Sequence, residues 1–107
     1  AQDSLNLASF QTKVELLPKE TFYLLCNVLH GTKPIKFQWF KNDQQISSSG
    51  RIVLETEPTM SMLKIYSVQY SDSGNYSCEA KNHVGSDVQS TILVVKGLNF
   101  SGFCDIF

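Results

Sequence analysis

In much of this chain every second residue is apolar. Stretches with this alternation recur every 8 to 12 residues, and turn-forming residues lie between them. In the stretch from 22 to 28, Phe22, Leu24, Cys26 and Val28 share one face, as alternate side chains of a β-strand must. No stretch shows the period of an amphipathic helix. We therefore expect an all-β chain in which seven or eight short antiparallel strands form a sandwich.

The length of 107 residues allows one domain, and a hydrophobic content of 42%, with 11% aromatic residues, is enough to fill one core. The net charge of −1 comes from nine basic and ten acidic residues, and no window holds the Lys/Arg cluster that a nucleic-acid partner requires. The apolar runs are about four residues long, against the roughly 20 that cross a bilayer, and no signal segment opens the chain. We expect a soluble fragment of a longer protein.

Residue types that serve catalysis and metal binding are present, but not in the patterns that those chemistries require. His30 and His83 fall in predicted turns, and no nucleophile signature surrounds any serine. The cysteines and histidines lack the spacing of zinc ligands. We expect no enzyme, no cofactor, no metal and no small-molecule substrate, so that any function lies on a surface.

Three cysteines and two glycosylation sequons bear on the compartment. Cys26 and Cys78 lie in predicted strands and Cys104 lies near the end of the chain. This arrangement favours an oxidising compartment, although buried cysteines also serve as plain apolar residues in the cytosol. Asn75 and Asn99 each begin an Asn-x-Ser acceptor pattern, which matters only in a secreted chain. Patterns this short also arise by chance, so an unused sequon is an equal alternative.

The spacing between several residues along the chain resembles that of a known protein family. Trp39 lies thirteen residues after Cys26, and Cys78 lies 39 residues after Trp39. The later part of the chain reads Leu63-x-Ile65-x-x-Val68-x-x-x-Asp72-x-Gly74-x-Tyr76-x-Cys78, then Ala80-x-Asn82-x-x-Gly85. Over residues 5–96 these positions resemble the I-set of the immunoglobulin superfamily, which implies an immunoglobulin-like sandwich of two antiparallel sheets. Residues 97–107 are then a tail or linker extension.

The resemblance implies a disulfide between Cys26 and Cys78 that joins the two sheets, with the Trp39 indole packed beside it. The 51 residues between the two cysteines are too few for the additional strands of a variable-type domain. The closed loop of about 50 residues predicts a stabilisation of about 4 kcal/mol against the unfolded chain.

The resemblance also implies a corner built from three residues. Tyr76 is placed to direct its hydroxyl to the backbone near Asp72, and Asp72 is expected to pair with Arg51. A functional alternative, in which Asp72 is a catalytic acid and Arg51 an anion clamp, is much less favoured than this structural role.

The outward positions of one sheet form a largely apolar set. The family's strands A, B, E and D make this sheet, and B and D flank E, so their outward side chains should be contiguous. A contiguous apolar face indicates a binding surface, although scattered exposed apolar residues are normal and a neighbouring domain is an alternative cover. The residues predicted to bind a partner are Tyr23, Leu25, Val53, Met60, Met62, Lys64 and Tyr66.

The opposite sheet is predicted to be more polar in its middle, although strand G should show Ile92 and Val94 to solvent. Asn75 is expected just before strand F of that sheet. A glycan at Asn75 would occupy the lower edge of this face and leave the A-B-E-D face free, which favours the latter as the partner surface.

Within the I-set, the runs PIKFQWFKNDQQI and IYSVQYSDSGNYSCEAKNHVGS are similar to modules of Dscam-type adhesion receptors. In that family, ectodomains of immunoglobulin and fibronectin modules recognise identical copies of themselves, in part through A-B-E-D faces in antiparallel two-fold pairs. The resemblance implies an extracellular module, with a membrane-anchored parent chain and another copy of itself as its protein partner.

Two other functions are compatible with the same residues. One is a structural or elastic module of a sarcomeric protein, in which the cysteines stay reduced. The other is a receptor module that binds a soluble protein ligand through its B–C and F–G loops.

The last eleven residues, 97–107, do not read as an ordinary linker, because they are apolar where a linker is polar. We expect them to fold back onto the sandwich or to contact another chain, and a non-native extension is an equal alternative. Cys104, which is left without a partner, indicates either intermolecular pairing or a free thiol.

Overall fold

The computed structural model describes residues 4–99 and 102–105. Within them no helix is long and apolar enough to span a membrane. The elements are β1 (Asn6–Leu7), β2 (Lys13–Leu16), β3 (Phe22–His30), β4 (Lys36–Lys41), β5 (Gln44–Ile46), β6 (Ile52–Glu57), β7 (Met60–Ile65), the 3-10 turn η1 (Tyr70–Asp72), β8 (Gly74–Lys81), β9 (Ser86–Asn99) and β10 (Gly102–Asp105).

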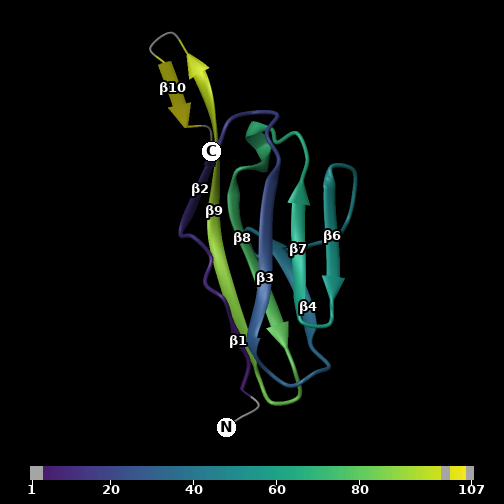
Figure 1. Cartoon of the computed structure of the whole chain (residues 1–107). Coiled ribbons are helices and arrows are strands. Elements are labelled where there is room, and N and C mark those ends of the chain that lie inside the picture. Colours follow the sequence, from purple (N-terminus) through teal and green to yellow (C-terminus); the bar gives the residue numbers. More distant parts are fainter. Residues whose placement is uncertain (1–3, 100–101, 106–107) are drawn as a thin grey trace.

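These strands form two sheets that face each other across the core (Figure 1). The first has the order β1-β3-β7-β6, and all its pairs are antiparallel. The second has the order β10-β9-β8-β4-β5, with β2 paired parallel to β9. The expected all-β immunoglobulin-like two-sheet sandwich is confirmed, and it is antiparallel except for the β2–β9 pair.

The core follows from the alternation along each strand. Phe22, Leu24 and Cys26 on β3 are buried while Tyr23 and Leu25 between them are exposed. Burial of one face of each sheet is the main stabilising term of such a sandwich. The other apolar side chains that are at most 2% exposed are Trp39, Leu63, Ile65, Val68, Tyr76, Cys78, Ala80, Leu93, Val94 and Val95.

The N-terminal stretch divides into two short strands that belong to different sheets (Figure 1). β1 pairs with β3 and β2 pairs with β9, so the chain crosses the edge of the sandwich between them. With β5 and β10 the described residues contain ten strands, and the expected seven or eight is therefore too low. The count was low because β5 and β10, of three and four residues, are too short for a clear alternation.

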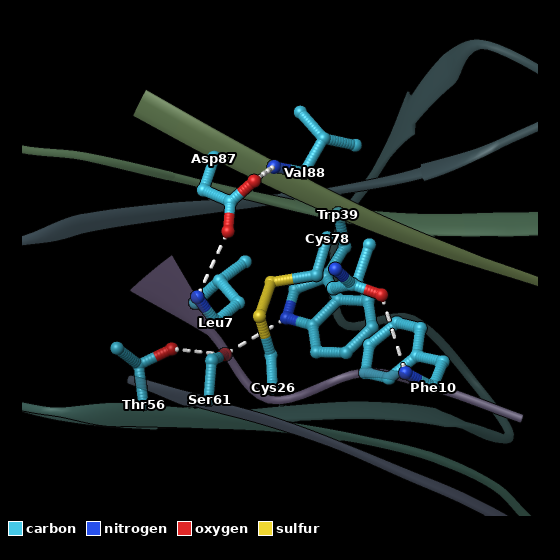
Figure 2. The surroundings of a disulfide bond; sticks show 10 residues. Leu7, Phe10, Cys26, Trp39, Thr56, Ser61, Cys78, Asp87 and Val88 are labelled. Carbon is cyan, nitrogen blue, oxygen red and sulfur yellow. Dashed lines mark hydrogen bonds between the residues drawn. A yellow bond between two sulfur atoms is a disulfide. The ribbon is translucent and has the colours of Figure 1, made fainter. Parts of the chain in front are cut away.

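Two polar side chains of β9 hold this crossover. The Leu7 N–H donates to Asp87 Oδ2 at 2.9 Å, and the Phe10 N–H donates to Gln89 Oε1 at 3.2 Å. The Phe10 ring stacks on Trp39 with centroids 6.4 Å apart. Figure 2 shows both hydrogen bonds beside the disulfide. Backbone donors that leave one sheet and have not yet joined the other thus find side-chain acceptors.

At the centre of the sandwich, Cys26 and Cys78 form a disulfide that joins the two sheets, as expected (Figure 2). The Trp39 side chain is buried beside it and donates from Nε1–H to Ser61 Oγ at 2.8 Å. Ser61 Oγ also lies 2.9 Å from Thr56 Oγ1. The indole therefore packs in the core with its one polar group satisfied, as a buried tryptophan requires.

The expected corner lies where η1 meets β8. The Tyr76 hydroxyl donates to the Asp72 carbonyl oxygen at 2.6 Å, and burial raises the pKa of Tyr76. Arg51 makes a two-pronged contact with Asp72, Nη1 to Oδ2 at 2.8 Å and Nη2 to Oδ1 at 3.2 Å. The Gln69 N–H also donates to Asp72 Oδ2 at 2.8 Å. All the partners of Asp72 are structural, and none points to acid catalysis.

Burial alone would raise the pKa of Asp72, but the hydrogen bonds from Arg51 and the Gln69 N–H outweigh it and hold that pKa below its ordinary value of 3.8. The carboxylate is thus kept ionised in the folded state, which serves an ion pair and not a proton donor.

Two positions on the second sheet differ from expectation. Asn75 lies inside β8, as its second residue, and not before it. Val94 was expected at the surface but is only 2% exposed. The reason is that β2 covers this edge of β9: Glu15 is the register partner of Val94, and it forms an ion pair with Lys96 at 3.2 Å.

The C-terminal part of β9 continues as a strand to Asn99, and β10 pairs with it in antiparallel register, Asp105 opposite Lys96. In Figure 1 this hairpin extends from one end of the sandwich. The tail therefore turns back along β9. The division into a domain at 5–96 and a tail at 97–107 stays a prediction, as do the roles of the Asn99 and Cys104 side chains, which lie outside the described side chains.

Candidate protein-binding face

The described residues bring together no metal-binding group. No cluster of three His, Cys, Asp or Glu side chains within this part of the chain is placed to hold a metal ion. His30 ends β3, His83 lies in the turn between β8 and β9, and both are exposed.

The face predicted from the sequence is the outer side of the β1-β3-β7-β6 sheet, hereafter the β3-β7-β6 face. Its central strand β7 pairs with β3 on one side and β6 on the other, so outward residues line up in rows across three strands. The first row is Tyr23, Lys64 and Val53, the second is Leu25, Met62 and Glu55, and the third is Asn27, Met60 and Glu57.

Much of this face is apolar and open to solvent. Tyr23 is 61% exposed, and Leu25 and Tyr66 are each 43% exposed. Met60, Met62 and Val53 are half-buried between their neighbours. Methionine and tyrosine side chains on a surface are common at binding sites, because one is adaptable and the other combines a large apolar ring with a hydroxyl. The structure thus brings all seven sequence-predicted residues onto one face.

One apolar residue of the face was not among those predicted. Leu29 is 58% exposed and follows Tyr23, Leu25 and Asn27 at the same period on β3. The period-two pattern was sufficient to find it. It was missed because the strand was expected to end near Val28, whereas β3 runs to His30.

A single ion pair crosses the apolar residues of the face. Lys64 Nζ lies 2.8 Å from Glu55 Oε1, and this hydrogen bond raises the pKa of Lys64. Glu55 is in the row next to Lys64, so the pair runs diagonally from the first row to the second. Exposed pairs of this kind add little to stability, but they give a surface a fixed pattern of opposite charges.

The opposite face, on β9-β8-β4, mixes polar and apolar residues. Val88 is 48% and Ile92 is 42% exposed, and between them and β4 lie Ser77 and Glu79 of β8. A shallow hollow of about 250 Å³ is lined by Phe40, Asp43, Ser77, Glu79 and Val88. The exposed apolar residues of this face are separated by polar ones, so they form no patch comparable to the β3-β7-β6 face.

Comparison with known proteins decides the family. The model of the immunoglobulin I-set domain matches residues 6–95. The chain belongs to the immunoglobulin I-set family. The matched region includes Cys26, Trp39 and Cys78, whose arrangement is the one described above.

Relatives of the I-set domain have different names and settings. The chain is 34% identical over 77 residues to the cell adhesion molecule DSCAML1 of Mus musculus, a match that covers 72% of this chain and 4% of that protein. It is similar to an I-band fragment of titin, with 28% identity and a TM-score of 0.78 over 86% of this chain and 32% of that one. It is also similar to the seventh immunoglobulin domain of Dscam1, with 26% identity and a TM-score of 0.76 over 83% of this chain and 93% of that domain.

The relatives thus include cell adhesion proteins and titin, and none of these three is an enzyme by its name. The chain spans only a few per cent of the length of the adhesion molecule that it matches. The family therefore establishes the kind of module, and the partner has to be argued from the surface.

Proposed function

We propose that this domain is an extracellular recognition module that binds another copy of itself through the β3-β7-β6 face. The observation that carries the proposal is the placement of Tyr23, Leu25 and Met62 in adjoining rows around one ion pair, with the exposed Tyr66 just beyond the end of β7. Adhesion molecules among the relatives, and the disulfide, support the extracellular setting and a protein partner. The membrane-anchored parent chain belongs to the same proposal.

The rows suit an antiparallel two-fold pair. A symmetric contact requires a patch that is complementary to itself. If the two-fold axis lies in the interface, perpendicular to the strands and between the first and second rows, the first row of one copy lies over the second row of the other. Tyr23 then meets Leu25 of the partner copy, and the Lys64 stem meets Met62 of the partner copy.

The charges select this axis position. An axis through the second row would place Glu55 on Glu55 of the partner copy, and an axis through the first would oppose two Lys64 ammonium groups. Like charges directly opposite each other are destabilising. With the axis between the rows, each Lys64 lies diagonally beside Glu55 of the partner copy, so the ion pair seen within the domain can be shared between copies.

Sedimentation velocity tests the face. Tyr23→Asp places a charge at the most exposed apolar position among the predicted residues and should weaken self-association by about tenfold or more. Val88→Asp, at the most exposed apolar position described on the opposite face (48% against 61% for Tyr23), is the matched control and should leave self-association unchanged. A wild-type protein that stays monomeric at hundreds of micromolar contradicts the proposal.

Charge exchange tests the register. Lys64→Glu alone and Glu55→Lys alone should each weaken self-association, because like charges then meet across the interface. An equimolar mixture of the two variants should associate more tightly than either one, since both cross-interface pairs become attractive. If the mixture associates no more tightly than either variant alone, the ion pair is not shared between copies.

A further inference from the structure

Asn75 combines a fixed backbone with an exposed side chain. Its N–H donates to Asn42 Oδ1 at 2.9 Å, and its carbonyl oxygen accepts from the Asn42 N–H at 2.8 Å. As an outward residue of β8, it lies opposite Ile92 of β9 in register. The amide of Asn75, the first residue of an Asn-x-Ser acceptor pattern, therefore reaches solvent from a rigid position.

Beside Asn75 the surface is hollowed. A shallow hollow of about 290 Å³ is lined by Thr12, Asn75, Ser90, Thr91 and Ile92. Ile92 is 42% exposed, and Ser90 is an exposed hydroxyl residue two positions before it on β9. A sugar ring has an apolar face of C–H groups and a rim of hydroxyls, so an exposed isoleucine beside a serine hydroxyl suits its chemistry.

The remainder of the sequon is closed in the folded domain. Tyr76 is buried, and Ser77, one of the residues that line the hollow beside Phe40, is only 9% exposed. β8 is hydrogen-bonded on both edges, to β4 and to β9. An enzyme that recognises the acceptor must contact both the asparagine amide and the hydroxyl two residues later. In the folded sheet that segment cannot leave its neighbours without breaking both ladders.

We propose that Asn75 is an N-glycosylation site that is open only before β8 joins the sheet, and that the first sugar then lies over Ile92. The inference rests on the extracellular setting of the proposed function. In the transfer, Asn75 Nδ2 forms a bond to C1 of an N-acetylglucosamine as the bond from C1 to a lipid-linked pyrophosphate breaks. Nδ2 loses one proton, which leaves with the lipid pyrophosphate, so no oxidant or reductant is needed.

The site also competes with closure of the disulfide. Cys78 lies three residues after Asn75, and its bond to Cys26 fixes β8 against the opposite sheet. Once that bond has formed and the sheet has assembled, the glycosylating enzyme can no longer reach the sequon. Modification therefore has to precede oxidation, and any delay in oxidation should raise the glycosylated fraction.

The modification is tested in protein secreted from eukaryotic cells behind an added signal peptide. Mass spectrometry of the peptide that contains Asn75 should find an N-linked glycan, which peptide-N-glycosidase removes with conversion of Asn75 to aspartate. Asn75→Gln and Ser77→Ala should each abolish it, while Asn99→Gln should leave it in place. An unmodified Asn75 in the secreted wild-type protein overturns the inference.

The order of events is tested with unglycosylated protein made in bacteria and oxidised to form the disulfide. Offered to microsomal oligosaccharyltransferase with its lipid-linked donor, the folded chain should stay unmodified, whereas the reduced and unfolded chain should be modified. Equal modification of both forms overturns the folding requirement. In secreting cells, Cys26→Ala should raise the glycosylated fraction.

The contact with Ile92 is tested by comparing thermal unfolding. The glycosylated protein should have a higher Tm than its enzymatically deglycosylated form, and this difference should shrink in an Ile92→Ser background. An unchanged difference overturns the contact. The same samples separate this inference from the proposed function. Loss of the glycan should not alter self-association through the β3-β7-β6 face. A protein that is glycosylated but monomeric would contradict the proposed self-association and leave the glycosylation site standing.

Discussion

At the scale of single residues, Asp72 shows how one side chain can organise a corner. Its buried carboxylate accepts hydrogen bonds from the Arg51 guanidinium and the Gln69 N–H. Its backbone carbonyl oxygen accepts a hydrogen bond from the Tyr76 hydroxyl. A buried charge without partners would be costly, so the corner depends on all of these contacts together. Arg51 also donates to the carbonyl oxygens of Tyr66 and Ser67, which ties β6 to the turn after β7.

This carboxylate predicts a pH dependence of stability. Because the folded pKa of Asp72 lies below its ordinary value of 3.8, its contribution to the free energy of unfolding is complete above that value and is lost as the pH falls through the folded pKa. Asp72→Asn should lower the free energy of unfolding by about 2 kcal/mol at pH 7 and should flatten its dependence on pH below about 4. Urea unfolding between pH 7 and pH 2 measures both effects.

Glu57→Gln, at an exposed carboxylate of β6, is the control for this experiment and should leave the acid dependence close to that of the wild type. If Asp72→Asn instead keeps the full acid dependence, the ion pair does not provide the stability that its geometry implies.

At the scale of elements, the N-terminal crossover between β1 and β2 is held by side chains that are distant in the sequence. Asp87 and Gln89 occupy inward positions on β9, where an apolar residue is the norm, and they accept from the backbone of residues about 80 positions earlier in the chain. Polar residues are tolerated there because the crossing segment brings donors that would otherwise lack partners. The two side chains thus keep β1 on one sheet and β2 on the other.

Asp87→Ala should therefore loosen this crossover. We expect faster amide hydrogen exchange at Leu7 and its neighbours, with exchange in β3 near Cys26 unchanged, and a loss of about 1 to 2 kcal/mol in the free energy of unfolding. Ser86→Ala, at an exposed position just before Asp87 on the same strand, is the matched control. Exchange that rises equally across the whole domain would show a global effect and contradict the local role.

At the scale of the whole molecule, the disulfide and the outer faces are the features on which the candidate protein classes differ. The Cys26–Cys78 bond joins sheets whose contacts are otherwise those of a packed apolar core. An elastic intracellular module, the alternative that similarity to titin supports, would keep these thiols reduced. A receptor module that binds through its loops would need neither the β3-β7-β6 face nor its ion pair.

Thiol titration of the denatured, unreduced protein separates the first two classes. The chain has three cysteines, so a formed Cys26–Cys78 bond leaves one free thiol for each chain, provided Cys104 is unpaired. Three free thiols contradict the extracellular reading. Reduction of the bond should lower the free energy of unfolding by about 4 kcal/mol, since the closed loop is about 50 residues long.

The period-two alternation and the spacing of Cys26, Trp39 and Cys78 were enough to predict the sandwich, its disulfide and the outward side of β3, because these depend on positions along single strands and on one family pattern. They could not predict that Val94 is buried. Burial there depends on β2, whose pairing with β9 brings together segments almost 80 residues apart.

The same limit applies to the polar residues. Nothing local in the sequence marks Asp87 and Gln89 as acceptors for the crossover, or shows that Ser77 of the Asn75 sequon is closed within β8. The sequence by itself determined which face of each strand is apolar. Only the tertiary structure decided which strand lies beside which, because neighbours across a sheet are chosen by pairing and packing between distant segments, and their polar groups are satisfied only after that choice.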